Sequence, residues 1–205
     1  MNRSAMLTRK LRIALLFPAL ALAACGGSGT SAPDEKPPLA GSSIGGPFTL
    51  TGEDGKPVHW SDFDGRYRIV YFGYTYCPDV CPLDVQTMVK GLKLFAEDHP
   101  DLASQVQPIF ISIDPARDTP DAIRQFTHAF SDKLVGLTGT PEQVAAAAKA
   151  FAVYYARGES QPGGGYLMDH SRGAYLMGKD GAAIALVPVD KDAPAVAAEL
   201  ARWVR

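Results

Sequence analysis

The sequence predicts an α/β domain built on a parallel or mixed sheet with helices on both faces. Two continuous apolar runs, 68–74 and 106–114, have the β-branched and aromatic composition of strands that are buried on both faces. Each run is followed by a segment whose apolar residues recur at helical spacing. This alternation of strand and helix is typical of a parallel sheet covered by helices.

The composition is that of a globular protein without a basic surplus. The 205 residues are 46% hydrophobic and 20% charged, with a formal net charge of -2. The length is sufficient for one domain with a real core. Lysine and arginine are scattered along the chain rather than clustered, so the sequence predicts no nucleic-acid partner.

Residues 1–24 have the pattern of a secretory signal. Basic residues precede an apolar run over 13–24, which is short for a membrane span. The run ends in "LAAC", which resembles the lipobox of bacterial lipoproteins. We therefore expect a lipoprotein signal peptide over 1–24, with Cys25 lipidated as the mature N-terminus. An ordinary signal peptide followed by an unrelated cysteine is the alternative.

The next segment predicts a tether. Residues 25–46 are rich in glycine, serine and proline and contain little to bury. A lipid chain followed by such a tether holds a domain near a membrane while leaving it free to reorient. We expect a folded domain over 47–205 in the cell envelope, on the periplasmic face, anchored to a membrane by lipid.

The first half of the domain contains a hairpin and two strand–helix units. The stretch "FTLTGEDGKPVHW" predicts two strands around an Asp54-Gly55 turn. Strand 68–74 leads into a helix over 82–98, which Pro100 ends. Strand 106–114 leads into a helix that runs through residue 130, with Thr119 as N-cap and Pro120 as first residue.

The second half adds a helix, three strands and a final helix. Thr140-Pro141-Glu142-Gln143 has the pattern of a capping box at a helix start. The remaining elements are strands near 153–156, 174–177 and 183–187 and a helix over 193–204. Two βα units, a β-hairpin and a C-terminal helix, with paired cysteines just after a central strand, describe a thioredoxin-like fold with an added N-terminal β-hairpin and an inserted helix.

The paired cysteines lie in "YFGYTYCPDVCP". If Cys25 carries lipid, Cys77 and Cys81 are the thiols that remain in the mature chain. A helix that starts at Pro82 places Cys81 near the N-cap and Cys77 in the loop above it. Unpaired amide N–H groups and the helix dipole favour thiolate there, so we expect both sulfurs to be reactive.

Several uses of this pair remain open. A structural disulfide is possible in a periplasmic protein. Thiol–disulfide exchange would have Cys77 attack and Cys81 resolve. Peroxide chemistry is weaker, because no motif places an arginine beside Cys77. Thiolates are also soft ligands, and Cu(I) suits two of them, with imidazole as a natural third ligand.

One histidine is a candidate for that third ligand. His59 lies in the predicted hairpin, His99 ends a helix, and His128 is expected to be solvated on its helix. His170 lies between a glycine-rich loop and a strand, where a mobile loop could bring it over the cysteines. A packing or turn role for a lone histidine is the alternative.

Four motifs together carry a family resemblance. In order, "YFGYTYCPDVCP", "FISIDPARDTP", "LTGT" and "MDHSRGAYLMGKDG" resemble the Sco/SenC family of copper-binding thioredoxin-fold proteins, over about residues 44–205. The resemblance implies a metallochaperone that binds Cu(I)/Cu(II) and assists assembly of the CuA centre of cytochrome c oxidase. The implied partner is subunit II of that oxidase or another periplasmic copper protein, and we expect a monomer.

The resemblance also assigns site residues. It implies Cys77, Cys81 and His170 as copper ligands. It implies that Asp114 tunes the centre from nearby, with a turn or capping role as the alternative. Asp79 and Asp169 could similarly tune the site or face water.

Two further functions use the same residues. A thiol–disulfide oxidoreductase could reduce the cysteines of a CuA site, and a copper-dependent redox sensor could use the same centre. Thioredoxins place a cis-proline before the strand that faces their cysteines, whereas Gly173 occupies that position here. This difference argues against thiol exchange as the main role.

Overall fold

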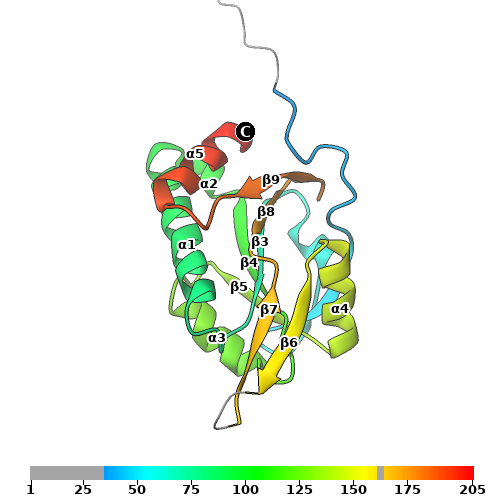
Figure 1. Ribbon diagram of the computed structural model, residues 1–205. Coiled ribbons are helices and arrows are strands. Elements are labelled where there is room, and N and C mark those ends of the chain that lie inside the picture. The colour runs from blue at the N-terminus through cyan, green and yellow to red at the C-terminus, as the bar shows by residue number, and fades with distance from the viewer. Residues whose placement is uncertain (1–34, 161–163) are drawn as a thin grey trace, which may run out of the picture. The chain divides into compact units, whose positions relative to one another are not determined.

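The computed structural model of the chain, shown in Figure 1, describes residues 35–160 and 164–205. The predicted signal peptide and Cys25 lie outside these residues. Within the described ranges, no helix combines the length and the apolar composition needed to cross a membrane. Residues 36–205 form a compact unit by themselves.

A mixed seven-stranded sheet forms the centre of the unit, in the order β2-β1-β5-β4-β3-β8-β9. Strands β3, β4 and β5 run parallel to one another, whereas β8 is antiparallel to β3 and β1 is antiparallel to β5. The predicted hairpin, now β1–β2, therefore extends the sheet beyond β5. The strands are β1 (Thr49–Gly52), β2 (Pro57–His59), β3 (Tyr67–Gly73), β4 (Val106–Ser112), β5 (Val135–Thr138), β8 (Ala174–Met177) and β9 (Ala183–Val187).

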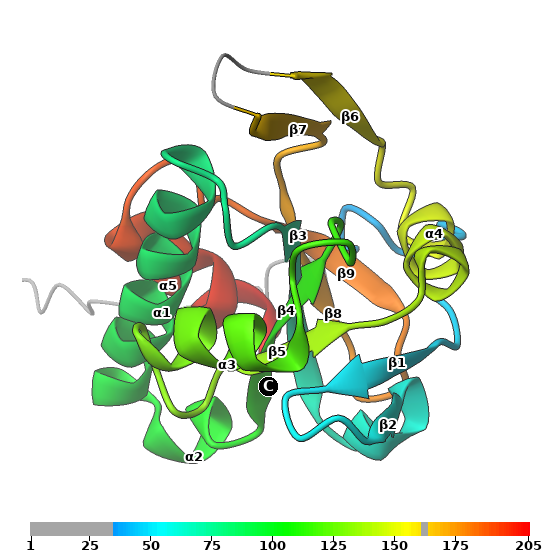
Figure 2. The same cartoon turned by 90° about the horizontal axis from the view of Figure 1, so that it is seen from below.

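Helices cover both faces of this sheet. Figure 2 shows α1, α3 and α5 on one side and α4 on the other. The close approach of α1 and α5 depends on Gly91, because a Cβ there would lie 2.4 Å from Val196. The helices are α1 (Val80–Asp98), α2 (Pro100–Ala103), α3 (Pro120–His128), α4 (Pro141–Ala150) and α5 (Ala193–Trp203), with a 3₁₀ turn at Trp60–Phe63.

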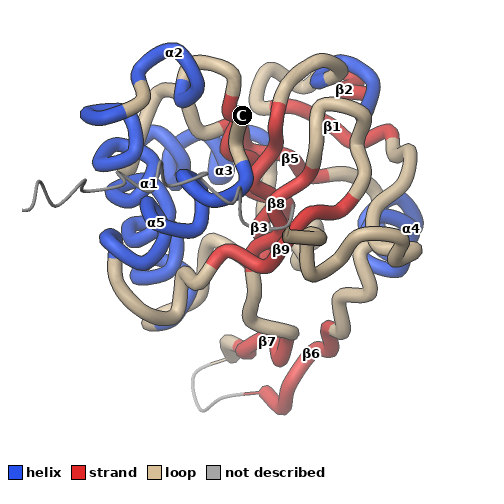
Figure 3. The backbone as a smooth tube through the Cα atoms, turned by 90° about the horizontal axis from the view of Figure 1, so that it is seen from above, coloured by secondary structure: helices blue, strands red, loops and turns tan. Residues whose placement is uncertain are grey.

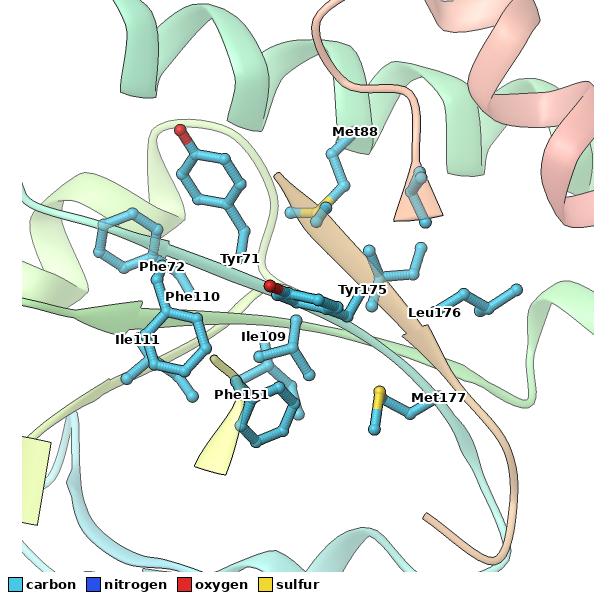
Figure 4. Close-up of a cluster of buried hydrophobic side chains, with 14 of the residues drawn as sticks. Tyr71, Phe72, Met88, Ile109, Phe110, Ile111, Phe151, Tyr175, Leu176 and Met177 are labelled. Atoms are coloured by element: carbon cyan, nitrogen blue, oxygen red, sulfur yellow. The ribbon is translucent and has the colours of Figure 1, made fainter. Parts of the chain in front are cut away.

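The two central strands explain why the sheet is covered on both sides. Every residue of β3 and of β4 is buried, as their continuous apolar composition predicts. In Figure 4, Tyr71 and Met88 lie on the side of α1, and Phe151 and Met177 lie on the opposite side. Apolar burial on both faces is the main stabilising contribution to this fold.

Local capping signals set the helix starts that the sequence predicted. The Thr119 hydroxyl accepts a hydrogen bond from the Ala122 N–H at 3.2 Å. Thr140 and Gln143 form the predicted capping box, with bonds of 2.8 and 3.3 Å. These caps satisfy N–H groups that have no partner inside the helix.

Two strands are absent from the prediction, and one is misplaced. β5 is short, and β7 (Tyr166–His170) alternates between half-buried and exposed residues, so neither shows an apolar run. β6 (Tyr155–Ser160) begins later than the predicted strand at 153–156. β6 and β7 pair with each other in a separate two-stranded antiparallel sheet (Figure 3).

Part of the segment assigned to the tether contacts the domain. The Leu39 N–H donates to the Ile184 carbonyl at 2.9 Å, and the Gly45 N–H donates to the Ala150 carbonyl at 2.8 Å. Leu39 and Ile44 also pack against the core. These two apolar residues within a polar segment bring the chain onto the domain before residue 47.

Candidate metal centre

The cysteine loop connects the carboxyl end of β3 to α1. Cys77 is 9% exposed and Cys81 is 0% exposed, so both residues are part of the buried core. The helix begins at Val80, not at Pro82 as predicted. Inside a helix, a proline ring clashes with the carbonyl four residues earlier, which for Pro82 is residue 78. Residue 78 lies outside the helix, so this clash does not arise. The N–H that Pro82 lacks would have no helical partner in the first turn.

Gly73 allows the Cys81 sulfur to lie directly on the end of β3. A Cβ at this position would be 3.2 Å from the Cys81 sulfur. It would also be 2.9 Å from the ring of Tyr71 and 3.0 Å from that of Phe110. The strand end therefore has no room for a side chain, and the sulfur occupies that space.

A buried carboxylate holds the start of the cysteine loop. Asp118, which is 0% exposed, accepts hydrogen bonds from the Thr75 N–H at 3.0 Å and the Thr75 hydroxyl at 2.6 Å. The Ser112 hydroxyl, at the end of β4, donates to the same carboxylate at 2.6 Å. Burial raises the pKa of Asp118 despite these bonds. The loop is thus fixed to the neighbouring strand.

His170 ends β7 and meets Cys81. Its Nε2 lies 3.4 Å from the Cys81 Sγ, and its Nδ1 lies 2.9 Å from the Ser171 carbonyl oxygen. Because a carbonyl oxygen only accepts, Nδ1 carries the hydrogen and Nε2 presents a lone pair to the sulfur. The rings of Tyr71 and Tyr74 lie edge-on to the imidazole, with centroids 6.5 and 6.1 Å away.

Burial favours the neutral forms of this pair. It lowers the pKa of His170 and raises the pKa of Cys81 well above its ordinary value. Desolvation therefore opposes the thiolate expected at Cys81, although this residue lies in the first turn of a helix. The Cys81 N–H of the first turn donates instead to the Cys77 Sγ, at 3.4 Å.

An ion pair between a buried carboxylate and an exposed arginine joins the two halves of the centre. Asp84 of α1 is 0% exposed and accepts two bonds from Arg172, from Nε at 2.7 Å and from Nη2 at 2.6 Å. The Tyr71 hydroxyl donates to the same carboxylate at 3.0 Å. Since Arg172 follows His170 by two residues, this pair ties the histidine segment to the helix that carries Cys81.

The three aspartates expected near the metal have other environments. Asp114 is 3% exposed, and both of its oxygens are engaged, one by the Tyr166 hydroxyl at 2.8 Å and one by the Arg117 Nε at 2.6 Å. Asp79, at the N-cap of α1, makes no side-chain capping bond and is exposed. Asp169 is also exposed.

The other histidines lie elsewhere. His59 contacts Thr49 in the β1–β2 hairpin, and His99 follows α1 and packs against Phe95. His128 is the last residue of α3 and approaches Glu53 at 3.1 Å, so it is neither in mid-helix nor simply solvated. Of the described histidines, His170 is the one that meets a cysteine.

An open pocket of about 380 Å³ leads to the centre. Cys77 and His170 lie in its wall together with apolar side chains of Tyr74, Val80 and Met168. A small ion or the side chain of another protein can therefore reach the Cys77 sulfur from outside.

Several residues that shape the centre were not identified from the sequence. Gly73, Arg117, Asp118 and Arg172 lie inside the motifs quoted above, so those motifs were a signal, but the partners that give these residues their roles are distant in the chain. Asp84 and Arg172, for example, are 88 residues apart. The residues concerned are Gly73, Asp84, Arg117, Asp118, Tyr166 and Arg172.

The fold and site together define a class of protein. The sheet, its covering helices and the cysteine pair after the central strand are those of a thioredoxin-like domain, and a histidine from a separate hairpin meets that pair. Residues 36–205 match the sequence profile of SCO1/SenC. The chain belongs to the SCO1/SenC family.

Individual relatives agree with this assignment. The chain is 48% identical over 139 residues to Protein SenC of Rhodobacter capsulatus, covering 67% of this chain and 60% of that protein. It is 40% identical over 162 residues to the mitochondrial SCO1 homolog of Homo sapiens, covering 79% of this chain and 53% of that protein. The chain thus spans little more than half the length of these relatives.

A solved structure gives the same result. Arabidopsis thaliana ScoI, solved with copper bound, superposes with a TM-score of 0.70 at 35% identity, covering 77% of this chain and 95% of that chain.

Proposed function

We propose that this protein is a copper metallochaperone, which binds Cu(I) and Cu(II) through Cys77, Cys81 and His170. In this proposal it supports assembly of the CuA centre of cytochrome c oxidase. Family membership and the copper bound in the Arabidopsis relative support the choice of metal. Two soft sulfur ligands and one imidazole suit copper in both oxidation states.

The observation that carries the proposal is the 3.4 Å separation between the Cys81 Sγ and the His170 Nε2. Metal–sulfur and metal–nitrogen bonds of about 2.3 and 2.0 Å, the lengths known for zinc, with a tetrahedral angle put two such ligands about 3.5 Å apart. This separation suits two ligands of one ion, and the Nδ1–H bond to Ser171 leaves the Nε2 lone pair free to bind a metal.

The third ligand requires an adjustment. Among residues 35–160 and 164–205, no three cysteine, histidine or carboxylate side chains are already arranged as a metal site. Cys77 lies in the wall of the same pocket and accepts the Cys81 N–H. A rotation about its one side-chain torsion is the change expected on binding, and two thiols would each release a proton as the ion enters.

The surroundings also support transfer to another protein. The thiols are buried, so an acceptor must reach into the pocket to receive the metal. Tyr76, Leu83 and Tyr154, from the cysteine loop, the first turn of α1 and the base of the β6–β7 hairpin, are 56%, 55% and 64% exposed. These apolar side chains offer contact area around the site. The proposed acceptor is subunit II of the oxidase or another periplasmic copper protein.

The test is an anaerobic copper titration of the reduced protein, followed by absorption spectroscopy with Cu(II). We expect one tightly bound equivalent and a thiolate-to-copper band. The band should be lost in Cys77→Ala, Cys81→Ala and His170→Ala, and His99→Ala should match the wild type. Weak copper binding that is the same in the wild type and in all of these variants would exclude the proposed centre.

A thiol–disulfide reductase is a second candidate, alone or as a preparation for metal transfer. Cys77 favours it, because its sulfur lies in the pocket wall and accepts an N–H from the helix start. The raised pKa of Cys81 disfavours the reductase role, because Cys81 would have to resolve the mixed disulfide and a protonated thiol is a weak nucleophile. Steady turnover of a disulfide substrate by metal-free protein would support this role. A copper-dependent sensor would use the same residues.

The proposed location is the periplasmic face of a membrane, with lipid on Cys25. The support is the order of basic, apolar and small residues before that cysteine. Labelling with radioactive palmitate should mark the full chain and should not mark Cys25→Ser. Membrane fractionation of the two proteins should show the same difference.

A further inference from the structure

The β6–β7 hairpin, which carries His170, is not part of the main sheet. Its strands pair only with each other among the described strands. A two-stranded hairpin by itself is only marginally stable in water. The position of His170 therefore depends on the contacts that fasten this hairpin to the rest of the domain.

One fastening lies at the base of the hairpin, close to His170, where Arg172 is bound to the buried Asp84 of α1. Beside it, the two arms of the hairpin are joined to each other: the Ser171 N–H donates to the Tyr154 carbonyl at 2.8 Å, and the Tyr154 N–H donates to the Ser171 hydroxyl at 3.0 Å. These contacts fix the end of the hairpin but leave the orientation of its far half to other residues.

A second fastening lies at Tyr166, the first residue of β7. Its hydroxyl donates to Asp114 at 2.8 Å, and its carbonyl accepts from the Arg117 Nη1 at 3.0 Å. The Arg117 guanidinium lies 3.6 Å from the centre of the Tyr166 ring, and that of Arg157 lies 3.9 Å from it. Cations at this distance from an aromatic ring are attracted to it.

The two partners of Tyr166 belong to the segment that connects β4 of the main sheet to α3. Asp114 follows β4 and is 3% exposed, and it also accepts the Arg117 Nε at 2.6 Å. The Arg117 guanidinium reaches further, to 4.8 Å from the ring of Tyr76 in the cysteine loop. One cluster thus contacts the hairpin, the segment after β4 and the loop that precedes Cys77.

We propose that Tyr166, Asp114 and Arg117 form a latch that sets the position of His170 relative to Cys81. They are positioning residues, because they hold the strand that presents the imidazole and make no contact with it. The inference rests on the proposed function only in taking His170 as a metal ligand. It gives Asp114 a role different from the expected tuning of the metal, since both of its oxygens are used by the latch.

The first test is independent of copper. In Tyr166→Phe the ring remains between the two guanidinium groups and only the bond to Asp114 is lost. We expect amide hydrogen exchange in 155–160 and 166–170 of the metal-free protein to become roughly tenfold faster. The reason is that losing one hydrogen bond to a carboxylate favours opening of the hairpin by about that factor. The NMR signals of the His170 ring should shift away from their wild-type positions.

The control is Leu167→Ala, which shortens a side chain of the same strand, β7, that is 42% exposed and does not line the pocket. It should leave both readouts unchanged. Asp114→Ala removes the acceptor of the Tyr166 hydroxyl and should accelerate exchange at least as much as Tyr166→Phe. The double variant should be no worse than Asp114→Ala alone, because Tyr166→Phe then removes a hydroxyl whose acceptor is already gone.

The second test measures Cu(II) dissociation by stopped-flow with a chelator. We expect roughly tenfold faster release from Tyr166→Phe than from Leu167→Ala. Unchanged hydrogen exchange in the hairpin would overturn the latch, and so would faster exchange with unchanged His170 signals and unchanged Cu(II) release. If wild-type protein binds no copper, the proposed function fails, while the metal-free measurements still decide on the latch.

Discussion

The ion pair between the buried Asp84 and the exposed Arg172 makes a sharp prediction for Arg172→Ala. The substitution removes two of the three hydrogen bonds that the Asp84 carboxylate accepts, at 2.7 and 2.6 Å, and leaves the Tyr71 bond at 3.0 Å. Asp84 is 0% exposed, whereas the Arg172 side chain is 42% exposed. The variant therefore keeps a buried charge and loses the cation that compensates it.

The size of the loss follows from two limits. Removing one partner of a buried ion pair costs about 3–5 kcal/mol, and the exposure of Arg172 favours the lower end of that range. The carboxylate can avoid the full cost by taking up a proton, which for an ordinary carboxyl group costs about 4 kcal/mol at pH 7. We therefore expect the free energy of unfolding of Arg172→Ala to be lower than that of the wild type by about 3 kcal/mol at pH 7.

The same reasoning fixes the direction of the pH dependence. If the folded variant keeps a proton that the unfolded chain releases, the folded state binds more protons than the unfolded state. Lowering the pH then stabilises the folded variant. The stability difference from the wild type should therefore shrink between pH 7 and pH 5. The double variant Asp84→Asn/Arg172→Ala, which has no carboxylate there, should be more stable at pH 7 than Arg172→Ala and should show little of this pH dependence.

The assay is urea unfolding of metal-free protein at both pH values. The control is Arg124→Ala, which breaks a pair of similar length, 2.7 Å, whose side chains are 50% and 72% exposed. Its loss should stay below about 1 kcal/mol. A loss from Arg172→Ala as small as that of the control, and the same at pH 5 and pH 7, would refute the argument.

Three further predictions concern the cysteine loop. Gly73→Ala should cost about 1–3 kcal/mol in urea unfolding through overpacking, whereas Gly173→Ala, with nothing within 4 Å of its added Cβ, should cost little; equal losses would contradict the close contact with Cys81. Iodoacetamide should modify Cys77 before Cys81 in reduced protein, because burial shields the second thiol and raises its pKa; peptide fragmentation by mass spectrometry would reveal the opposite order. Asp118→Ala should lose about 3 kcal/mol by leaving three donors without an acceptor, and Asp118→Asn should lose less in the same assay; equal losses would contradict the role of its hydrogen bonds.

Local signals made most of the fold predictable. The buried strands β3 and β4 have continuous apolar composition, and the starts of α3 and α4 are marked by Thr119 and Thr140 next to proline. β7 has no such signal, because it is half exposed and pairs only with β6. Its strand character depends on a neighbour that the sequence does not identify.

The site was predictable in its reactive groups but not in its environment. The sequence predicted that His170 comes over the cysteines, and the structure places it 3.4 Å from Cys81. The prediction of a reactive Cys81 weighed the helix start and could not include burial at 0% exposure, which raises the pKa of this thiol. Asp114 was expected to tune the metal, and only the tertiary structure reveals its bonds to Tyr166 and Arg117.

The two halves of the proposed centre are held in different ways, and this bears on how copper would be released. Cys81 lies in the core on the end of β3, and Asp118 fixes the loop that leads to Cys77. His170 lies on a hairpin that side-chain contacts attach to the domain. Moving the hairpin would remove the imidazole while the sulfurs stay in place.

That asymmetry has different consequences for the two oxidation states. Cu(I) is well suited to two thiolates, whereas Cu(II) gains more from imidazole. Loss of the histidine should therefore accelerate Cu(II) release more than Cu(I) release. Arg172→Ala should have the same selectivity, because the ion pair with Asp84 ties the histidine segment to the helix that carries Cys81. Equal acceleration for both ions would mean that the two halves of the centre move together.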